Sequence, residues 1–412
     1  MPEFLTLLPP DDARALLLAN ITAPLVASQA IDTDSSLGRV TAEDVIAPHP
    51  LPEFLRTTVD GYAVRARDTF GASESLPAYL KLKGEVPMGD APTFGLNPGE
   101  CALIHTGGML PPNADAVVML EYTQLVGSEI EVMRAVADGE NIIRIGEDVA
   151  KGQVVLPQGS LIRPAEIGGL MALGVTKIHV AAQVKVGLIS TGDEVIDPTQ
   201  HPRPGQVRDI NTFTLAALVE KAGGRPVRYG IIPDEFSALQ KAAERALTEC
   251  DVVVITAGSS ASTRDMTARV IGTLGAPGVL VHGINTRPGK PTILGACGGK
   301  AVIGLPGNPV SALVNGYMLL VPVIERLLGQ LARPRASIRA RLAVNLASQA
   351  GREDWWPVRL VPTPGGNSGW EAEPIFGKSN LIFTMSAADG LIKIHPDANG
   401  LAAGEIVEVF LM

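Results

Sequence analysis

The sequence predicts a multidomain chain in which a three-layer α/β/α domain lies between two β-rich regions. Residues 183–331 alternate apolar runs of strand length with stretches of helical periodicity, which is typical of a parallel sheet covered by helices on both faces. Residues 51–150 and 335–412 hold only short β-like runs separated by turn residues. The 412 residues are enough for about two to four domains of about 100–200 residues each.

Composition and charge exclude several classes of protein. Hydrophobic residues make up 46% of the chain, too many for a disordered protein, and the 44 Gly and 32 Pro lack the three-residue period of collagen. With a formal charge of -9 and 4% aromatic residues, the chain lacks the broad basic face that neutralises nucleic-acid phosphates. We therefore expect no nucleic-acid partner, although a local basic pocket is compatible with these numbers.

The cysteine, histidine and hydropathy patterns bear on metal sites, disulfides and cellular location. Cys101, Cys250 and Cys297 form no CxxC pair and the histidines show no HExxH spacing, which argues against a thiolate zinc site or a disulfide framework. The N-terminus lacks a basic segment before its apolar stretch, and the most apolar run, Ala312–Gly329, is interrupted by polar residues and proline. We expect a cytoplasmic protein with no membrane partner.

The N-terminal region is predicted to be helical. Asp11 and Asp12 favour a helix start, and the helical pattern is expected to extend over residues 11–47 until prolines break it. Residues 151–182 contain a second helical stretch, Pro164–Leu173, and form either a linker or a return to the first element.

Both β-rich regions consist of predicted short strands. The predicted strands are Leu80–Val86, Cys101–His105, Ala116–Leu120 and Glu129–Val132 in the first region, and Ser337–Val344, Trp356–Val361, Leu391–His395 and Ile406–Leu411 in the second. In the first region, three glycine-bearing loops carry Asp60, Thr106 and Asp148. For each loop taken alone, a tight turn is the simpler interpretation.

The region between them contains alternating strands and helices. The predicted strands are Val184–Ser190, Val227–Ile232, Asp251–Thr256, Val279–Ile284 and Ala301–Leu305, and the predicted helices are Thr212–Ala222, Ser237–Thr248, Asp265–Leu274 and Val310–Leu328. Such units imply a parallel sheet that binds ligands at the carboxyl ends of its strands. No GxxxxGK[ST] motif and no helix-opening GxGxxG motif occurs, so P-loop and Rossmann assignments lose their main support.

Two loops at these strand ends point to charged ligands. The first ends in Asp193 and Glu194, whose carboxylates either hold a hard cation or a ribose hydroxyl, or cap a turn. The second, after Asp251–Thr256, is rich in hydroxyl groups and leads into a helix, which makes it a natural anion cradle. Arg264 adds a charge there, and Asp265 either caps the helix or binds a metal.

Two further loops combine proline and glycine with polar residues. In the turn that contains Arg287 and Lys290, two prolines and a glycine direct two cations the same way, which suits an oxyanion or simply makes a rigid exposed connection. In the other loop, Asn308 is placed as the N-cap and Pro309 at the first helical position. A cap alone does not explain Pro306 before them.

Taken together, these segments resemble the MoeA family, the molybdopterin molybdenumtransferases, which are related to gephyrin's E domain and its plant counterpart. The matching segments are VDGYAVR, HTGGMLPPNADAVVMLE, GEDVAKG, ISTGDE, the loop at Arg264-Asp265, PGKP, GLPGNPVSA and NGLAAGEIVEV. They occur in the family's order and span nearly the whole chain, which makes the resemblance highly specific.

The resemblance implies four domains. They are a helical and extended linker domain (residues 1–50 and 151–182), an inserted β-rich domain (51–150), a molybdopterin-binding three-layer α/β/α domain (183–331) and a C-terminal β-barrel-like domain (335–412). It also implies a homodimer whose active cleft is shared between subunits. The adenylyltransferase that makes the precursor is a further candidate partner.

The resemblance also implies a reaction and a set of residues. Adenylyl-molybdopterin and molybdate react in the presence of Mg²⁺, AMP leaves, and molybdenum becomes bound to the dithiolene. The residues that match functional positions are Asp60, Thr106, Asp148, Glu194, Asp234, Asp265, Arg287, Lys290, Pro306 and Pro309. Together with residues of the predicted anion-binding loops, the expected site is Asp60, Thr106, Asp148, Glu194 and Asp265 for catalysis; Ser259, Ser260, Arg264, Arg287, Lys290, Pro306, Asn308, Pro309 and Ser311 for substrate binding; and Asp234, Asp265 and Glu194 for the metal.

Two departures from the family pattern leave alternatives open. The loop after the central strand is GSSASTRD where many relatives have a GGVS-type loop, and Gly283 and Arg287 stand where many have lysines. A preference for tungstate is one alternative, and a non-catalytic molybdopterin carrier or scaffold is another. A different enzyme on the same α/β module is a third, and the motifs outside that module argue against it.

Overall fold

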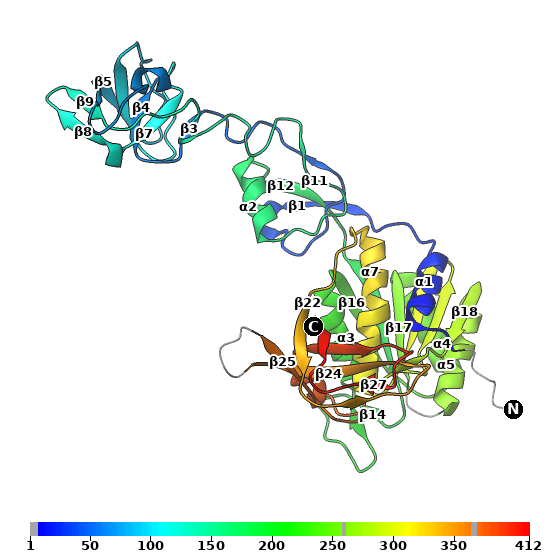
Figure 1. Cartoon of the computed structure of the whole chain (residues 1–412). Coiled ribbons are helices and arrows are strands. Elements are labelled where there is room, and N and C mark those ends of the chain that lie inside the picture. The colour runs from blue at the N-terminus through cyan, green and yellow to red at the C-terminus, as the bar shows by residue number, and fades with distance from the viewer. Residues whose placement is uncertain (1–6, 258–260, 364–368) are drawn as a thin grey trace.

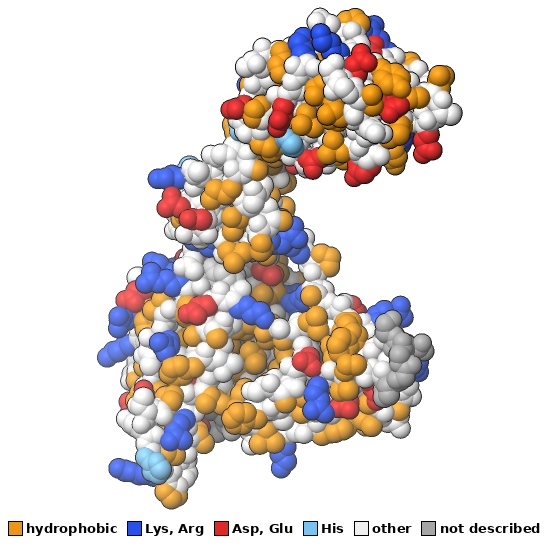
Figure 2. All heavy atoms as spheres, turned by 90° about the vertical axis from the view of Figure 1, so that its left-hand side faces the viewer, with side chains coloured by type: hydrophobic (Ala, Val, Ile, Leu, Met, Phe, Trp, Pro, Cys, Tyr) orange, Lys and Arg blue, Asp and Glu red, His pale blue; other side chains and the backbone are white. Residues whose placement is uncertain are grey.

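The molecule is long, and its parts follow one another in line (Figure 1). The computed structural model describes residues 7–257, 261–363 and 369–412, without the side chains of 261–264. A distal domain (residues 51–150) stands at one end, a waist (28–50 and 151–182) follows, and a broad body formed by the remaining described residues lies at the other end. The narrowing at the waist is also plain in the space-filling view (Figure 2).

The N-terminal segment is helical only in its first part. Helix α1 spans Pro10–Asn20, carries Asp11 and Asp12 in its first turn, and buries Ala13 and Leu17 completely. The predicted helix over residues 11–47 is therefore wrong beyond Asn20. The chain turns to extended structure there because strand partners from a distant part of the sequence supply its hydrogen bonds.

Those partners build the waist. Strand β1 (Ser28–Asp32) pairs antiparallel with β12 (Lys177–Ala181), and β2 (Val45–Ile46) pairs with β11 (Val154–Leu156). Helix α2 (Pro164–Ala172), which the sequence predicts closely, covers them. The waist is thus made by two chain segments that lie side by side, one entering the distal domain and one leaving it.

The distal domain is a sheet with strand order β7-β4-β6-β5-β9-β8. Its strands are β4 (Gly61–Val64), β5 (Ala78–Val86), β6 (Glu100–Ile104), β7 (Ala116–Met119), β8 (Thr123–Val126) and β9 (Glu129–Val132). The pair β3 (Arg56–Thr57) and β10 (Ile142–Ile143) closes its neck. Gly61 begins β4 rather than a hairpin turn, and the Val118 carbonyl occupies the place that a Cβ would take.

The body is built on a sheet with strand order β16-β13-β17-β21-β20-β18. Its strands are β13 (Val184–Thr191), β16 (Gly224–Ile232), β17 (Val252–Ala257), β18 (Pro277–His282), β20 (Ile293–Cys297) and β21 (Lys300–Pro306). Strand β20, which no sequence pattern indicated, runs antiparallel to both neighbours, so the sheet is mixed rather than parallel throughout. The connection from β18 to β20 is too short for the helical crossover that a parallel neighbour needs.

Helices cover both faces of this sheet. These helices are α3 (Asn211–Lys221), α4 (Phe236–Glu249), α5 (Ala261–Thr273), α6 (Pro309–Asn315) and α7 (Val321–Leu328). Val252 and Val254 of β17 pack on the side of α1, α3, α6 and α7, and Val253 and Ile255 pack on the side of α4 and α5. The alternation confirms the predicted three layers. Helix α4 spans Phe236–Glu249 and has Glu235 at its N-cap, so it starts one residue before the predicted Ser237.

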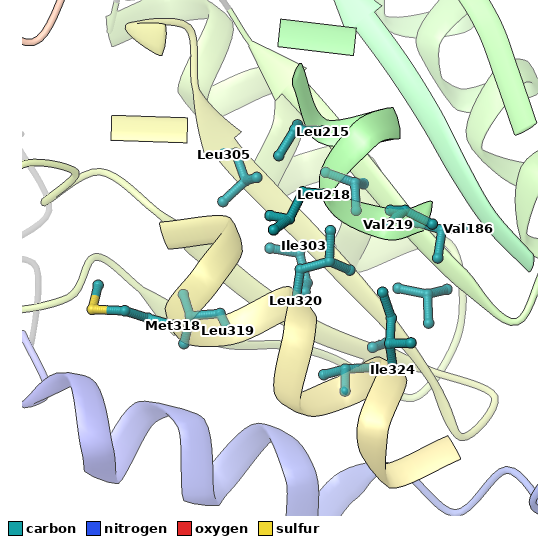
Figure 3. Close-up of a cluster of buried hydrophobic side chains, with 14 of the residues drawn as sticks. Val186, Leu215, Leu218, Val219, Ile303, Leu305, Met318, Leu319, Leu320 and Ile324 are labelled. Atoms are coloured by element: carbon teal, nitrogen blue, oxygen red, sulfur yellow. The ribbon is translucent and has the colours of Figure 1, made fainter. Parts of the chain in front are cut away.

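The core beneath α3 is dense (Figure 3). Leu215 and Leu218 of α3 lie against Ile303 of β21 and Leu320 of the following helical run. In that run a π-helical turn, Gly316–Leu320, joins α6 to α7. Among the described residues, the helical run Pro309–Leu328 has the length and hydropathy of a membrane span. In this run, 67% of its apolar 18-residue stretch is buried inside the body.

The C-terminal region is a closed barrel, as the family resemblance implies. Its strands are β22 (Ser337–Leu342), β24 (Glu353–Pro362), β25 (Trp370–Pro374), β26 (Gly390–Ile394) and β28 (Ile406–Leu411), and β24 pairs with both β25 and β26. Strand β25 was not predicted. A short strand from the α/β domain, β19 (Thr286–Arg287), adds to this sheet beside β24.

The shorter elements complete the chain. They are β14 (Val195–Ile196), β15 (Val207–Arg208), β23 (Leu346–Ala347), β27 (Gly400–Leu401), helix α8 (Phe383–Ser386), and the 3₁₀ turns Thr33–Ser35, Ala66–Thr69 and Leu120–Tyr122.

Candidate functional site

A pocket of about 640 Å³ opens between the α/β domain and the barrel. The α/β domain contributes the loop 286–291, which follows β18, and the loop that follows β21. The barrel contributes residues 352–357 and 375–384. Of the predicted binding residues, the pocket brings together Arg287, Lys290, Pro306, Asn308 and Ser311.

The start of helix α6 forms one wall. Asn308 occupies the N-cap position and Pro309 the first helical position, as predicted. The Asn308 side chain makes no capping hydrogen bond and instead lines the pocket. The N–H of Val310 donates to the carbonyl of Ser379 at 3.0 Å, which fastens this helix start to the barrel.

The turn that carries Lys290 is shaped by Gly289. Gly289 has a φ of +104°, a conformation that L side chains rarely adopt, and a Cβ there would overlap the side-chain amide of Asn315. The turn is therefore held in shape by its packing against Asn315 of helix α6, in addition to its prolines. The sequence pattern did not show this contact.

Arg287 crosses from the α/β domain to the barrel. Its guanidinium Nη1 lies 3.6 Å from Oδ2 of Asp354, and its Cζ lies 5.2 Å from the centre of the Trp356 ring. Asp354 is fully buried and also accepts hydrogen bonds from Arg352, at 2.7 Å from Nε and 3.2 Å from Nη2. Two guanidinium groups from two domains thus share one carboxylate.

The pocket is strongly cationic. Arg287, Lys290, Arg352 and Lys378 line it, and within the described parts of the chain its lining includes no aspartate or glutamate. Guanidinium and ammonium groups at this density favour phosphate or another oxyanion, because charge-assisted hydrogen bonds to such anions are strong.

Buried polar atoms at the same sheet edge lack partners. Thr191 Oγ1, Asn211 Oδ1 and Thr212 Oγ1 are buried side-chain oxygens with no hydrogen-bond partner. Nδ2 of Asn211 donates to the carbonyl of Gly307 at 2.8 Å, which places α3 beside the pocket loop. Buried polar groups are normally hydrogen-bonded, so these oxygens favour a polar ligand at this edge.

Two of the predicted metal ligands follow the carboxyl ends of strands and the third lies in helix α5, and in the described part of the chain they form no preassembled cage. Glu194 is exposed after β13, and the N–H of Asp234 donates to Oδ1 of Asp193 at 3.2 Å, so the loops after β13 and β16 touch. Asp265 lies one turn inside α5, which begins at Ala261, so it does not cap that helix. The described residues contain no group of three His, Cys, Asp or Glu side chains arranged to hold a metal.

Part of the predicted anion cradle falls outside the described part of the chain. Ser259 and Ser260 lie outside the described residues, and Arg264 belongs to α5 with its side chain outside the description.

The distal domain holds the other predicted catalytic residues. Oδ1 of Asp60 accepts hydrogen bonds from the N–H of Thr106 at 2.7 Å and from its hydroxyl at 3.1 Å. These bonds, with the nearby His105, lower the pKa of Asp60. Asp148 is exposed in a neighbouring loop. Within one chain the waist separates the distal domain from the body that holds the pocket (Figure 1).

Several site residues escaped the sequence analysis. Arg352 directly precedes β24 and Asp354 is its second residue, in the segment GRED, where three successive charged residues before a tryptophan were an available signal. Lys378 and Asn380 lie in a loop without periodicity, and nothing local distinguishes them. Asn211 and Thr212 start α3, where their residue types suggested only a helix start.

An α/β sheet whose strand ends meet an anion-binding pocket is the architecture of an enzyme that acts on small anionic molecules. Three sequence families match the chain: the MoeA N-terminal region (domain I and II) at residues 8–174, the "Probable molybdopterin binding domain" at 187–326, and the MoeA C-terminal region (domain IV) at 339–412. The chain belongs to the MoeA family, and as a member it is a transferase of molybdenum cofactor biosynthesis.

Relatives and solved structures match over nearly full length. A protein of Methanocaldococcus jannaschii assigned to molybdopterin biosynthesis is 38% identical over 93% of this chain and 92% of its own length. The molybdopterin molybdenumtransferase of Haemophilus influenzae is 33% identical over 97% of each chain. The crystal structure of a molybdopterin biosynthesis MoeA protein from Pyrococcus horikoshii superposes with a TM-score of 0.85 at 32% identity, covering 99% of this chain and 100% of that one.

Proposed function

We propose that this chain inserts molybdenum into adenylyl-molybdopterin, with molybdate as the metal source, and releases AMP. The observation that carries the proposal is the cationic pocket, because both substrates are anions and the pocket joins the carboxyl edge of the sheet to the barrel. Arg287, Lys290 and Arg352 hold molybdate and the phosphoanhydride in this proposal. The AMP phosphate then leaves from the α/β side.

Mg²⁺ fits the acidic loops at the same edge. It usually binds proteins through one or two carboxylates together with substrate phosphates and water, so a preassembled cage of three carboxylates is not required. In the proposal Glu194 and Asp234, whose loops touch, hold the ion, and Asp265 of α5 is the third candidate ligand. Bound there, Mg²⁺ would stabilise charge on the leaving phosphate.

A homodimer explains the position of the distal residues. Asp60, Thr106 and Asp148 cannot reach the pocket of their own chain in this arrangement, so a second subunit would supply them (Figure 1). The waist offers a suitable surface. Ile46 of β2 and Val154 of β11 are paired with each other, and they are 55% and 42% exposed. Neighbouring exposed aliphatic side chains of this kind are typical of a surface that another protein covers.

The direct test is incubation of the purified protein with adenylyl-molybdopterin, Mg²⁺ and molybdate, followed by measurement of AMP. The proposal expects AMP release that requires both the oxyanion and Mg²⁺. If tungstate supports release better than molybdate, the chain is the tungstate-preferring variant. If the pterin binds tightly and no AMP appears with either oxyanion, the chain is a carrier or scaffold.

The shared cleft has its own test. Asp60→Ala and Lys290→Ala should each abolish turnover. Mixed and re-equilibrated, the two inactive proteins should recover about a quarter of the wild-type activity, because half of the dimers are mixed and each mixed dimer has one intact cleft. If no activity returns although mixed dimers form, the cleft is not shared.

A cytoplasmic location completes the proposal. Cys101, Cys250 and Cys297 are free and buried, which suits a reducing compartment. An adenylyltransferase that supplies the precursor is the proposed transient partner, and no nucleic acid or membrane is required. Co-purification of the two enzymes from a cytosolic fraction, with AMP release faster from enzyme-bound than from free precursor, would support both points.

A further inference from the structure

Asp354 is the feature of the pocket that the proposed reaction does not use directly. Its carboxylate is 0% exposed and lies at the start of β24, behind the pocket wall. A buried charge is costly unless it is paired and hydrogen-bonded. Arg352 meets that need with two hydrogen bonds, yet Arg287 from the other domain also approaches the same carboxylate.

The approach of Arg287 is enforced by the backbone. Strand β19 runs parallel to β24, with Thr286 opposite Glu353 and Arg287 opposite Asp354. The hydroxyl of Thr286 also donates to the carbonyl of Glu353 at 3.2 Å. The two arginines are therefore brought together by the join between the domains.

Trp356 holds Arg287 from another side. The guanidinium lies over the indole ring, and the ring itself is fixed by an edge contact with Phe376 at 5.6 Å. A guanidinium over the face of an indole is attracted by the ring quadrupole, and Arg suits such stacking better than Lys. The arginine and the tryptophan thus form a matched pair.

The donors of both guanidinium groups are only partly occupied by these contacts. Arg352 contacts Asp354 through Nε and Nη2. Arg287 contacts Asp354 through Nη1 and lays one face of its guanidinium on the Trp356 ring. Their side chains are 27% and 53% exposed and line the pocket. Two guanidinium groups held close would repel each other, and the shared carboxylate offsets that repulsion.

We propose that Asp354 and Trp356 are positioning residues that hold Arg287 and Arg352 side by side as a preorganised receptor for a tetrahedral dianion. The identity of that dianion as molybdate or tungstate rests on the proposed function. Neither residue touches the anion. Each acts by keeping a guanidinium where the anion binds.

The test measures oxyanion binding to the full-length protein without pterin. Molybdate, tungstate and sulfate are titrated calorimetrically, and indole fluorescence is recorded in a Trp370→Phe background. Asp354→Asn should weaken molybdate binding about 10–100-fold, because a supporting group that orients binding ligands has been removed. Trp356→Leu should weaken it about 2–5-fold, and Trp356→Phe, which keeps an aromatic face, should restore most of the loss.

A double-mutant cycle separates positioning from general structural support. In an Arg287→Ala background, Trp356→Leu should cause no further loss of molybdate affinity, since the tryptophan acts only through that arginine. The matched control is Glu373→Gln, which breaks the Arg359–Glu373 ion pair on β24 and β25 of the same barrel. It should leave molybdate affinity unchanged. Circular dichroism and thermal melting monitor folding.

Three results would overturn the proposal. They are unchanged molybdate affinity in a folded Asp354→Asn protein, equal losses from Trp356→Leu with and without Arg287, and no oxyanion binding by the wild type. Failure of the proposed function is a separate outcome. In that outcome the wild type binds the dianion, and Asp354→Asn and Trp356→Leu weaken binding as expected, but the wild type releases no AMP from adenylyl-molybdopterin.

Discussion

The side-chain amide of Asn315 donates hydrogen bonds to the carbonyl of Gly289 at 3.1 Å and to Oγ1 of Thr292 at 2.6 Å. Asn315 ends helix α6, whose first residues form one wall of the cationic pocket, and Gly289 belongs to the turn that carries Lys290. One buried side chain therefore ties helix α6 to the turn that carries Lys290.

Gly289→Ala should disable the pocket. The new methyl group would overlap the Asn315 amide, and the φ of +104° disfavours any L side chain. We expect molybdate affinity and AMP release to fall about 10-fold or more, since small displacements of positioned groups have large effects on catalysis. Gly168→Ala is the matched control, because that glycine lies in α2 with nothing within 4 Å of a built Cβ. Equal losses in both variants would contradict the explanation.

Asn315→Ala should lower the free energy of unfolding by about 1–3 kcal/mol, the cost of leaving buried hydrogen-bonding groups without a partner. The measurement is urea denaturation followed by circular dichroism. Asn20→Ala removes an exposed amide that donates to the carbonyl of Leu16 within α1, and it should change stability by no more than about 0.5 kcal/mol. A stability of Asn315→Ala equal to that of the wild type would rule out this role.

Thr106→Val should raise the pKa of Asp60 part of the way to its ordinary value. The N–H of residue 106 still donates after the change, and only the hydroxyl bond is lost. The folded-state pKa of Asp60 is lowered, so its contribution to stability is present above the unfolded-state pKa and is lost as pH falls through the folded-state pKa.

The pH dependence of stability follows from the lowered folded-state pKa of Asp60. The acid side of the stability curve of Thr106→Val should be less steep, because the difference between the two pKa values is smaller. Carboxyl NMR of selectively labelled protein measures the pKa directly. Thr123→Val, which removes an exposed hydroxyl bonded to the Leu120 carbonyl in the same domain, should leave the Asp60 titration unchanged. An unaltered Asp60 pKa in Thr106→Val would contradict the assignment.

Lys378→Met should weaken oxyanion binding about 3–10-fold at low salt, and less as ionic strength rises. The residue is an exposed cation in the pocket lining, and attraction between exposed charges is screened by salt. The measurement is molybdate titration at two salt concentrations. Lys81→Met, on a strand of the distal domain, is the charge-matched control and should bind molybdate as the wild type does. A loss that does not change with salt would argue against a direct electrostatic role.

The sequence predicted the α/β core and part of the pocket well. The predicted strand Asp251–Thr256 is apolar at its four central positions, and the observed strand β17 is buried on both faces. Asn308 and Pro309 start α6 as local capping rules require. The start of α5 was predicted at Asp265 but lies at Ala261, because the polar segment before Asp265 is compatible with either a loop or a helix.

The sequence by itself determined the elements whose signals are local. These are the alternating strands and helices, the helix start after β21, and the stiff turn that carries Arg287 and Lys290. Only the tertiary structure decided that Ser28–Asp32 and Val45–Ile46 become strands, that β20 runs antiparallel, and that Arg287 joins Arg352 at Asp354. The physical reason is the same in each case. Strand pairing and charge compensation depend on partners that are distant in the sequence, and no periodicity or cap in a local window records them.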